Sequence, residues 1–439
     1  MKVLKFGGTS VGTAQRIQHV ARLAVASGRN VVVLSAMAGT TNTLVEISAY
    51  LYKGNVPGAQ ETLNALRQKY AGVIAELYDN DASRERATAV TDRTFSLIAH
   101  FMEGEFTVAE EKEVLSCGEL LSTALMHIYL EQIGVKVALL PALEYMRTAQ
   151  GGEPDMKYIS SRLRRLIDLE PDAQLWLTQG YICRNAYGEV DNLRRGGSDY
   201  SASIIGAALG VEEIQIWTDI DGMHNGDPRI VSNTRPVEHL HFEEAAELAY
   251  FGAKILHPTC VLPAKLSNIP VRLLNTMQPE ARGTIIANFP PDGTIKAVAA
   301  KDHITAIKIK SGRMLLAYGF LHKVFEIFDK HHTAIDMMAT SEVGVSLTID
   351  DTDHLAAIVD ELKGFGTVTV DSDLVIVCVV GDFSGEQGST YCAHVVNALE
   401  DIPVRMISYG GSNYNISVAI RAVDKERALN SLNHNLFDL

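Results

Sequence analysis

The stretch MKVLKFGGTSVGT, residues 1–13, joins a short strand to a pair of glycines and points to an α/β fold. Val3–Phe6 read as the strand, and Gly7 and Gly8 follow at once. Glycines lack a Cβ, so their N–H groups can approach a phosphate, and a following helix N-terminus adds positive potential. Lys5 precedes the glycines, which matches neither a P-loop nor a dinucleotide fingerprint. The stretch predicts a phosphate loop with Lys5 beside the transferred group, although a tight turn also fits.

Beyond this stretch, strand-like and helical patterns alternate up to about residue 287. The runs NVVVLSAMAG, AQLWLTQGYI and EIQIWTDIDG read as strands within residues 30–39, 173–182 and 213–222. Helical patterns lie between and after them, as at residues 109–134 and 198–210. This alternation favours a parallel or mostly parallel sheet covered by helices, which is an α/β domain.

Length and composition limit the possible functions. The 439 residues are typical of about two to four domains, and 47% hydrophobic with 21% charged residues is ordinary for a globular protein. A net charge of −14 argues against a broad nucleic-acid or membrane-binding surface, but it permits a local cationic pocket. The chain shows no membrane-helix run, no signal-peptide pattern, and no metal or disulfide spacing among its five cysteines. We therefore expect a cytoplasmic protein without nucleic-acid or membrane partners.

Residues 288–294, NFPPDGT, read as a linker, and the order of predicted strands and helices changes after them. A strand, a helix, two strands and a second helix follow, and a similar order then recurs. Residues 336–338 align with residues 405–407 in the two copies. We interpret this as an internal repeat of a small α+β unit, which favours a regulatory or pairing module. Chance similarity of two ferredoxin-like segments remains an alternative.

Two further loops share the chemistry of the first. LSAMAGTTN, residues 34–42, ends a strand in small and hydroxyl residues. LRRGGSDYSAS, residues 193–203, places an arginine, two glycines and a predicted N-cap, Ser198, before a helix. Loops at the carboxyl ends of parallel strands meet at one sheet edge, where ligands bind in such folds. Three such loops predict a site for a polyphosphate and an anionic co-substrate.

Charged residues elsewhere add candidates to this site. In CGELLS, Gly118 interrupts a helical pattern at a cost of about 1 kcal/mol relative to alanine, so another segment is expected to approach closely there. Glu119 beside it can hold a ligand ammonium group, although a solvated helix glutamate is the simpler interpretation. WTDIDGMHNGDPR supplies Asp219 and Arg229, and FGAKILHP supplies Lys254. Each motif alone also fits a turn, but their combination favours a site.

The motifs KFGGTSV, GRNVVVLSAMAGTTN, CGELLS, RRGGSDYSA, WTDIDGMHNGDPR and FGAKILHP, in this order, closely resemble those of the aspartate kinases of the amino acid kinase family. The resemblance covers nearly the whole chain, and the C-terminal repeat resembles the paired ACT domains of monofunctional members. It implies an amino acid kinase domain at 1–287, a linker and leading strand at 288–302, and ferredoxin-like ACT domains at 303–372 and 373–439. The second repeat runs to Leu439, so we expect no fused homoserine dehydrogenase.

The resemblance also implies roles for individual residues. Lys5 would neutralise the transferring phosphoryl group, Asp199 would orient that lysine, and Lys254 would complete the catalytic set. The implied ATP-binding residues are Lys5, Gly7, Gly8, Ser35, Thr218, Asp219, His224 (often a tyrosine in the family), Arg229, Lys254 and Ile255. The implied substrate-binding residues are Thr41, Glu119, Arg195, Gly196, Gly197 and Ser198. Among them, Glu119 would pair with the aspartate ammonium and Arg195 would grip its α-carboxylate with two parallel hydrogen bonds.

The implied reaction is the ATP-dependent phosphorylation of the aspartate side chain to 4-phospho-aspartate, the first step of lysine, threonine and methionine biosynthesis. Phosphoryl transfer depends mainly on positioning and charge neutralisation. A carboxylate nucleophile is already ionised at pH 7 and needs no general base, which agrees with the lack of an evident catalytic histidine or cysteine. We expect Mg²⁺ to arrive bound to ATP, without a protein metal site.

Residues 314–347 resemble the effector-binding ACT unit of lysine-sensitive members. The matching positions are Met314, Gly319, Phe320, Leu321, Asp336, Ser341 and Glu342. Ala317 replaces a serine that is often found there. Asp336 and Glu342 can meet the two ammonium groups of lysine, so we expect lysine to inhibit. ACT units usually pair across subunits, which implies a homodimer or a dimer of dimers.

Two other functions stay open at this point. A related kinase could act on glutamate, acetylglutamate or a nucleotide, but Glu119 and Arg195 together suit a free amino acid. An amino-acid sensor without kinase activity is the second alternative. Intact Lys5, Asp199 and Asp219 argue against it, as does Lys254.

Overall fold

The computed structural model describes residues 1–193, 196–252, 256–312, 318–385 and 388–437. The chain divides into two compact units. The first unit contains Met1–Met223 and Leu256–Asn288, and the second contains His224–Ile255 and Phe289–Leu439. Several sequence motifs predicted to act together are therefore divided between the units.

A mostly parallel sheet forms the centre of the first unit, as the sequence predicts. Its strands are β1 Val3–Phe6, β2 Asn30–Leu34, β3 Val137–Leu140, β4 Leu175–Gln179, β7 Ile214–Thr218, β9 Val271–Asn275 and β10 Thr284–Ala287. They lie in the order β3-β4-β2-β1-β7-β9-β10, and only β10 among them runs antiparallel to its neighbour. A separate hairpin consists of β5 Ile182–Arg184 and β6 Val190–Asn192.

Strand β1 lies in the middle of this sheet, and all four of its side chains are buried. Strands covered on both faces carry near-continuous apolar runs, and β1 and β2 follow that rule apart from Lys5 and Asn30. The backbone register pairs Lys5 with Val33 on one side and with Ile216 on the other. A lysine in a buried central strand is costly unless it finds a charged partner, so its position indicates a function.

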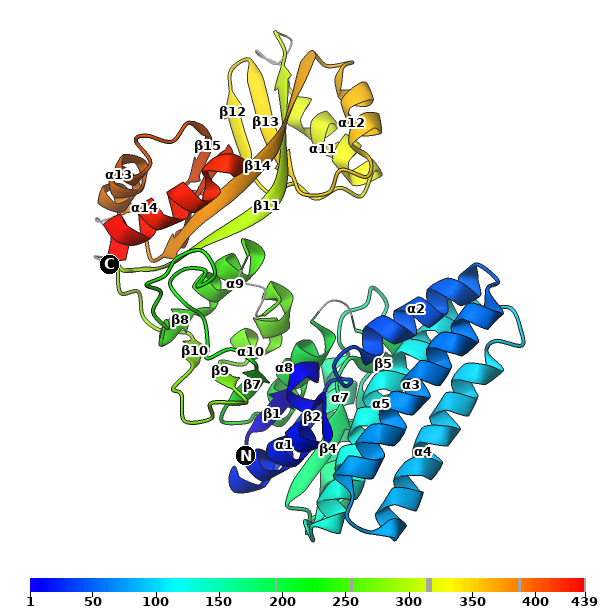
Figure 1. Cartoon of the computed structure of the whole chain (residues 1–439). Helices are drawn as coiled ribbons and strands as arrows, with labels where there is room; N and C mark the ends of the chain where they lie inside the picture. The colour runs from blue at the N-terminus through cyan, green and yellow to red at the C-terminus, as the bar shows by residue number, and fades with distance from the viewer. Residues whose placement is uncertain (194–195, 253–255, 313–317, 386–387, 438–439) are drawn as a thin grey trace. The chain divides into compact units, whose positions relative to one another are not determined.

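Helices surround the sheet (Figure 1). They are α1 Ala14–Ala26, α2 Thr40–Tyr52, α3 Val56–Leu77, α4 Asp81–His100, α5 Val108–Gln132, α6 Ala142–Tyr145, α7 Met156–Leu169, α8 Gly197–Leu209 and α10 Leu262–Leu266, with 3-10 turns at η1 Gly8–Val11 and η2 Pro258–Val261. The long helices α3, α4 and α5 pack side by side in one layer (Figure 1). Helix α5 begins with a reciprocal capping box between Thr107 and Glu110, which stabilises its first turn.

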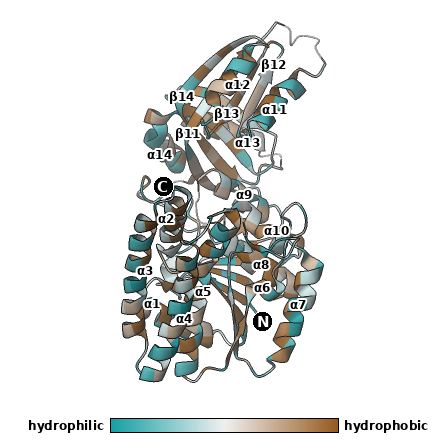
Figure 2. Ribbon diagram, turned by 90° about the vertical axis from the view of Figure 1, so that its right-hand side faces the viewer, coloured by the Kyte–Doolittle hydropathy of each residue, from teal (hydrophilic) through white to brown (hydrophobic). Residues whose placement is uncertain are grey.

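The second unit contains an antiparallel six-stranded sheet. The helices and strands of the second unit are β8 His239–His241, α9 Phe242–Tyr250, β11 Ile295–Lys310, α11 Phe320–Lys330, β12 Met338–Ser341, β13 Gly344–Ile349, α12 Leu355–Leu362, β14 Thr367–Gly381, α13 Gly388–Ala398, β15 Val404–Tyr409, β16 Asn415–Arg421, η3 Ala422–Asp424 and α14 Lys425–Phe437. The strands of the sheet lie in the order β12-β13-β11-β14-β16-β15. The three strands from one edge, β12-β13-β11, have the same relative chain order as the three from the other edge, β15-β16-β14, in agreement with the internal repeat. In Figure 2 its strands are largely brown, whereas its helices show both colours.

Two long strands join the halves of this sheet. Residues 304–310 of β11 pair with β14 residues 367–374, while residues 295–301 pair with β14 residues 376–381. The apolar cores differ: one forms under α11 and α12, and the other under α13 and α14. The stretch before residue 303 is therefore part of the sheet, because its strand hydrogen-bonds to the second repeat.

Candidate active site

A cavity of about 840 Å³ opens at the carboxyl ends of the parallel strands in the first unit. The three glycine-rich or hydroxyl-rich loops all line it, as the sequence predicts. The lining residues of the first two loops are Lys5, Gly8, Thr9, Ser35, Ala36, Met37, Ala38, Gly39, Thr41 and Asn42. Those of the third loop are Leu193, Gly196, Gly197, Ser198 and Asp199. The other lining residues are Val108, Glu111, Lys112, Leu115, Glu119, Tyr181, Asp191 and Asn192. The structure therefore brings together most of the predicted substrate and phosphate contacts.

The first loop needs glycine for a steric reason. A Cβ on Gly8 would lie 2.6 Å from the carbonyl oxygen of Ala36, which belongs to the backbone of the second loop. The Ala38 N–H donates to the Gly8 carbonyl at 3.0 Å, and the Gly7 N–H donates to the Trp217 carbonyl at 3.1 Å. The glycine pair thus packs the strand end against both neighbours, and at Gly8 it leaves no room for a side chain.

Lys5 and Asp199 form an ion pair at the base of the cavity. Lys5 Nζ lies 2.6 Å from Asp199 Oδ1, and the two side chains are only 9% and 14% exposed. The contact lacks the alignment of a hydrogen bond, since Asp199 Oδ1 has no hydrogen-bond partner. Asp199 is in the first turn of α8. A charged lysine held in this way can turn toward an anion that enters the cavity.

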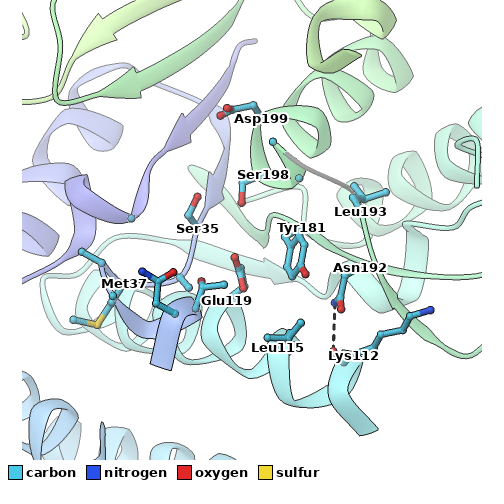
Figure 3. Close-up of a pocket in the computed structure, with 18 of the residues that line it drawn as sticks. Ser35, Met37, Lys112, Leu115, Glu119, Tyr181, Asn192, Leu193, Ser198 and Asp199 are labelled. Atoms are coloured by element: carbon cyan, nitrogen blue, oxygen red, sulfur yellow. Dashed lines mark hydrogen bonds between the residues drawn. The ribbon is translucent and has the colours of Figure 1, made fainter. Parts of the chain in front are cut away.

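Glu119 supplies a buried carboxyl group opposite this pair, and it points into the cavity (Figure 3). Its Oε2 atom is buried without a hydrogen-bond partner. Burial raises the pKa of Glu119 to about 8, although hydrogen bonding to Ala36 and the charge of Lys5 act in the opposite direction. A buried carboxyl group of this kind would be stabilised in its charged form by a ligand ammonium group.

Gly118 explains how the second loop reaches Glu119. A Cβ at Gly118 would lie 2.7 Å from the Ala36 Cβ, so the helix and the loop touch at this point. The close approach expected from the helix-interrupting glycine is confirmed. Ser122, one turn further along α5, donates to the Ser35 carbonyl at 2.8 Å. Helix α5 thus holds the second loop in place.

The third loop differs from the prediction in one detail. We predicted Ser198 as the N-cap, but α8 begins at Gly197, and its N-cap is Gly196 with φ of 74°. A left-handed backbone suits glycine, and a Cβ at Gly196 would collide with the Cys260 sulfur. Ser198 is instead inside the first turn, where its side chain points into the cavity (Figure 3).

Tyr181 is a cavity residue that the sequence analysis missed. Its φ of 65° is unusual for an aromatic residue, and its N–H donates to the Ser201 hydroxyl at 2.9 Å. A Cβ on Gly197 would approach the Tyr181 ring to 2.5 Å, so the ring and the loop are in contact. The only signal in the sequence was a glycine, Gly180, followed by an aromatic residue at a strand end.

Other predicted nucleotide-site residues do not line this cavity. Thr218 ends β7 and its hydroxyl interacts with Ile220, while Asp219 follows in an exposed turn. His224 and Arg229 belong to the second unit, where the Arg229 guanidinium donates to Asp227 at 2.7 Å. The predicted contacts Arg195, Lys254 and Ile255 fall outside the described residues, as does Met314 of the predicted effector pocket.

The remaining effector residues occupy different settings in the second unit. Phe320 and Leu321 begin α11 after Gly319, its N-cap, and contribute to the core beneath the helix. Ser341 ends β12, and Glu342 follows it in the exposed turn before β13. The Asp336 side chain is fully buried, and its Oδ1 atom lies 2.5 Å from Lys301 Nζ. Of the two carboxylates expected to bind the ammonium groups of lysine, Glu342 is therefore exposed, and Asp336 is already paired with Lys301.

The described residues contain no group of three or more histidine, cysteine or acidic side chains that could hold a metal ion. Glu119 and Asp199 are nevertheless acidic lining residues of the cavity. Mg²⁺ commonly keeps water and phosphate ligands and needs only one or two carboxylates. The residues present thus fit a metal ion carried by a nucleotide. Within the same described ranges, no helix combines the length and the apolar character needed to cross a bilayer.

Comparison with known families identifies both parts of the chain. Residues 1–275 match the amino acid kinase family, and residues 377–436 match the ACT domain. The lysine-sensitive aspartokinase 3 of Escherichia coli is 34% identical, and the similarity covers 99% of both chains. Aspartokinase 1 of Arabidopsis thaliana, a chloroplastic protein, is also 34% identical, over 99% of this chain and 80% of the relative.

A solved structure agrees with this assignment. The E. coli aspartokinase III in complex with aspartate and ADP is similar over 100% of both chains, with a TM-score of 0.84 and 34% identity. The fold, the cavity with its three loops and the match along the full length point the same way. The chain belongs to the amino acid kinase family and, within it, to the aspartokinases.

Proposed function

We propose that this chain transfers the γ-phosphoryl group of ATP to the side-chain carboxylate of L-aspartate. The observation that carries the proposal is one cavity containing both the Lys5–Asp199 pair and the buried carboxyl group of Glu119. The ammonium of Lys5 suits a phosphoryl group, and the carboxyl group of Glu119 suits the ammonium of an amino acid. A solved relative holds aspartate and ADP, which supports the same pair of ligands.

Aspartate would bind with its ammonium group at Glu119. The unpartnered Oε2 atom of Glu119 accepts a hydrogen bond from this ammonium, which removes a buried and unsatisfied acceptor. Arg195 is the proposed partner of the α-carboxylate, and Thr41 and Ser198 line the same cavity. These contacts would direct the side-chain carboxylate of aspartate toward Lys5.

ATP would present its terminal phosphates to the glycine pair. Gly8 lines the cavity, and neither Gly7 nor Gly8 carries a Cβ that would keep a phosphate away from the backbone. Thr218, Asp219, His224, Arg229, Lys254 and Ile255 are the proposed contacts to the rest of the nucleotide. Mg²⁺ bound to the phosphates supplies further charge neutralisation.

The reaction would then be an in-line displacement. An oxygen of the aspartate carboxylate forms a bond to the γ-phosphorus, and the bond from that phosphorus to the bridging oxygen of ADP breaks. Lys5, released from Asp199, neutralises charge on the transferring group. No general base is required because the nucleophile is already ionised at neutral pH.

The test is an ATP-dependent hydroxamate assay, which traps an acyl phosphate as it forms. Aspartate, glutamate and acetylglutamate are compared at equal concentrations, with ADP release as a second readout. We expect product with aspartate and at least about a hundredfold less with acetylglutamate, whose blocked nitrogen cannot bind Glu119 as an ammonium. Equal rates with aspartate and acetylglutamate would contradict the assigned role of Glu119.

We further propose that lysine inhibits the enzyme through the first of two ACT units, at residues 303–372 and 373–439, in a homodimer or a dimer of dimers. A lysine-sensitive relative and a related structure in complex with lysine and aspartate support this, with 34% identity in both cases. An effector acts only if it binds two global states with different affinities. Lysine titration of the kinase reaction, beside threonine, tests the proposal. An unchanged rate up to millimolar lysine would contradict it.

A further inference from the structure

The Asp336 carboxylate is hydrogen-bonded on one side only. Its Oδ1 atom accepts from Lys301 Nζ at 2.5 Å and from the Tyr250 hydroxyl at 2.7 Å. Its Oδ2 atom is buried without a hydrogen-bond partner. A buried carboxylate oxygen without a donor is costly, so this atom marks a place where a further donor would be stabilised.

Lys301 contacts a second carboxylate as well. Its ammonium lies 2.9 Å from Asp350 Oδ2, and it also lies over the Tyr250 ring at 4.3 Å from the centroid. The Lys301 side chain is 17% exposed, whereas that of Asp350 is 41% exposed. Burial alone would lower the pKa of Lys301, but its hydrogen bonds to Asp336 and Asp350 outweigh this effect and raise it. Lys301 therefore stays charged and is shared between two acids.

The charges of Asp336, Asp350 and Lys301 do not balance, and one more cation would neutralise them. Asp336 and Asp350 carry two negative charges, and Lys301 supplies one positive charge, so the cluster has a net charge of −1 when all three groups are ionised. An ammonium group on a ligand would neutralise it. The ligand cannot share Asp336 with Lys301 at no cost, because two ammonium groups at one buried carboxylate repel each other. Asp350 offers Lys301 another partner nearer the solvent.

We propose that Lys301 is a tethered ammonium that occupies Asp336 in the effector-free enzyme, and that the ammonium of a free diamino acid displaces it onto Asp350. This proposal rests on the proposed role of Asp336 in binding lysine. Lys301 acts as an intramolecular competitor and sets the effector concentration at which the enzyme responds. Asp350 receives the displaced group, so the exchange leaves no ammonium unpaired.

The exchange also reaches the end of helix α9. Tyr250 is the last residue of α9, and it loses the shared arrangement with Lys301 and Asp336 when the ammonium groups exchange. Gly252, two residues later, packs against the carbonyl group of Ala300, which is next to Lys301 in β11. Lys254 follows in the same segment of the sequence. The carboxylate that would take the effector is thus bonded directly to the segment that carries a proposed nucleotide contact.

Two substitutions test the exchange because they act in opposite directions. Lys301→Met removes the competitor, so the lysine concentration that half-saturates the full-length enzyme should fall about tenfold. Asp350→Asn removes the alternative partner of Lys301 and should raise that concentration several-fold. Lys308→Met, an exposed lysine on the same strand, is the matched control and should change nothing. Isothermal titration with lysine measures binding without relying on activity.

The outcomes separate this inference from the proposed regulation. If the unmodified enzyme binds no lysine, the proposed effector fails, and the exchange fails with it. If the unmodified enzyme binds lysine but Asp350→Asn binds it equally well or more tightly, only the exchange is overturned. The Asp350→Asn variant keeps the Lys301–Asp336 pair, so it tests the exchange even if Lys301→Met does not fold. Weaker lysine binding by a folded Lys301→Met would overturn the exchange as well.

Discussion

Two buried lysine–aspartate pairs, one in each compact unit, have nearly the same length and different surroundings. Lys5 and Asp199 approach to 2.6 Å without hydrogen-bond alignment. Lys301 and Asp336 approach to 2.5 Å in an aligned hydrogen bond, which the Tyr250 hydroxyl reinforces. The first pair lines an open cavity, and in the second pair the aspartate side chain is fully buried.

This difference suits the two roles proposed for the pairs. A catalytic lysine must leave its aspartate in every turnover to neutralise a phosphoryl group, so a poorly aligned contact lowers the barrier to its release. A regulatory lysine must remain in place until an effector competes for the same carboxylate, so an aligned and supported bond is appropriate. The two pairs have nearly equal ion-pair distances, and they differ in hydrogen-bond alignment and in access.

The largest expected effect tests the catalytic pair. Replacing Lys5 by methionine removes the charge that we assign to the transferring phosphoryl group, and turnover should fall by about three orders of magnitude or more. ATP and aspartate binding should weaken much less, because the glycine loop and Glu119 remain. ADP-release kinetics and calorimetric titration measure the two effects. Lys2→Met, which breaks the Lys2–Glu213 pair near the other end of the strand, is the control. If Lys5→Met turned over within a few-fold of the unmodified enzyme, the proposed role of Lys5 in neutralising the phosphoryl group would be contradicted.

Glu119→Gln should have the next largest effect. The substitution keeps the shape of the side chain but removes the charge that pairs with the aspartate ammonium, so the KM for aspartate should rise about a hundredfold. Turnover at saturating aspartate should change much less. Steady-state kinetics separate the two constants. Glu131→Gln, on the same helix but paired with Arg86, should leave both constants unchanged. An unaltered KM in Glu119→Gln would place the ammonium elsewhere.

The pH dependence of aspartate binding follows from the same residue. The pKa of Glu119 is raised to about 8 in the ligand-free protein, so the group is mostly protonated at pH 7 and must lose a proton to bind an ammonium. Affinity for aspartate should therefore fall about tenfold for each pH unit below 8 and level off above it. Calorimetric titration between pH 6 and 8.5 in buffers of different ionisation enthalpy also counts the released proton. A flat profile would show that Glu119 is already ionised.

The smallest expected effect is that of Gly118→Ala, which is compared with the same substitution at Gly72, another glycine inside a helix. Gly118→Ala should gain about 1 kcal/mol of helix propensity, but its Cβ would push the second loop away at Ala36. We expect kcat/KM to fall about tenfold without the full gain in stability. Gly72→Ala in α3, where nothing lies within 4 Å of the added Cβ, should stabilise the protein and leave kcat/KM unchanged. Kinetics with thermal melting measure both, and equal activity of the two variants would contradict the role of this contact.

Much of the cavity lining could be predicted because its signals in the sequence are local. A lysine inside a buried strand, with Gly7 and Gly8 directly after that strand, indicates a phosphate loop. Gly118 inside a helical pattern indicates a close approach. The misplaced N-cap at Ser198 has an equally local cause. Two glycines precede that serine, and a left-handed Gly196 allows the helix to begin two residues earlier than a Ser198 N-cap would.

Long-range pairs could not be predicted in the same way. Tyr181 has no motif, and its left-handed backbone is stable only because the third loop packs against it. Lys301 and Tyr250 are 51 positions apart in the sequence, and no periodic pattern connects a strand residue with the end of a distant helix. Their contact with Asp336 depends on how β11, α9 and the segment just before β12 pack together.

The sequence by itself determined the fold class, the three loops and the family, because strand periodicity, glycine placement and motif order are properties of neighbouring residues. Only the tertiary structure decided which charges are neutralised and which polar atoms remain without a partner. Glu119 and Asp336 are both acidic residues in motif-bearing segments, and the chain alone does not reveal that each has one buried oxygen left unsatisfied. Burial and pairing depend on segments brought together from far apart, so the energy of each charge is set by the fold.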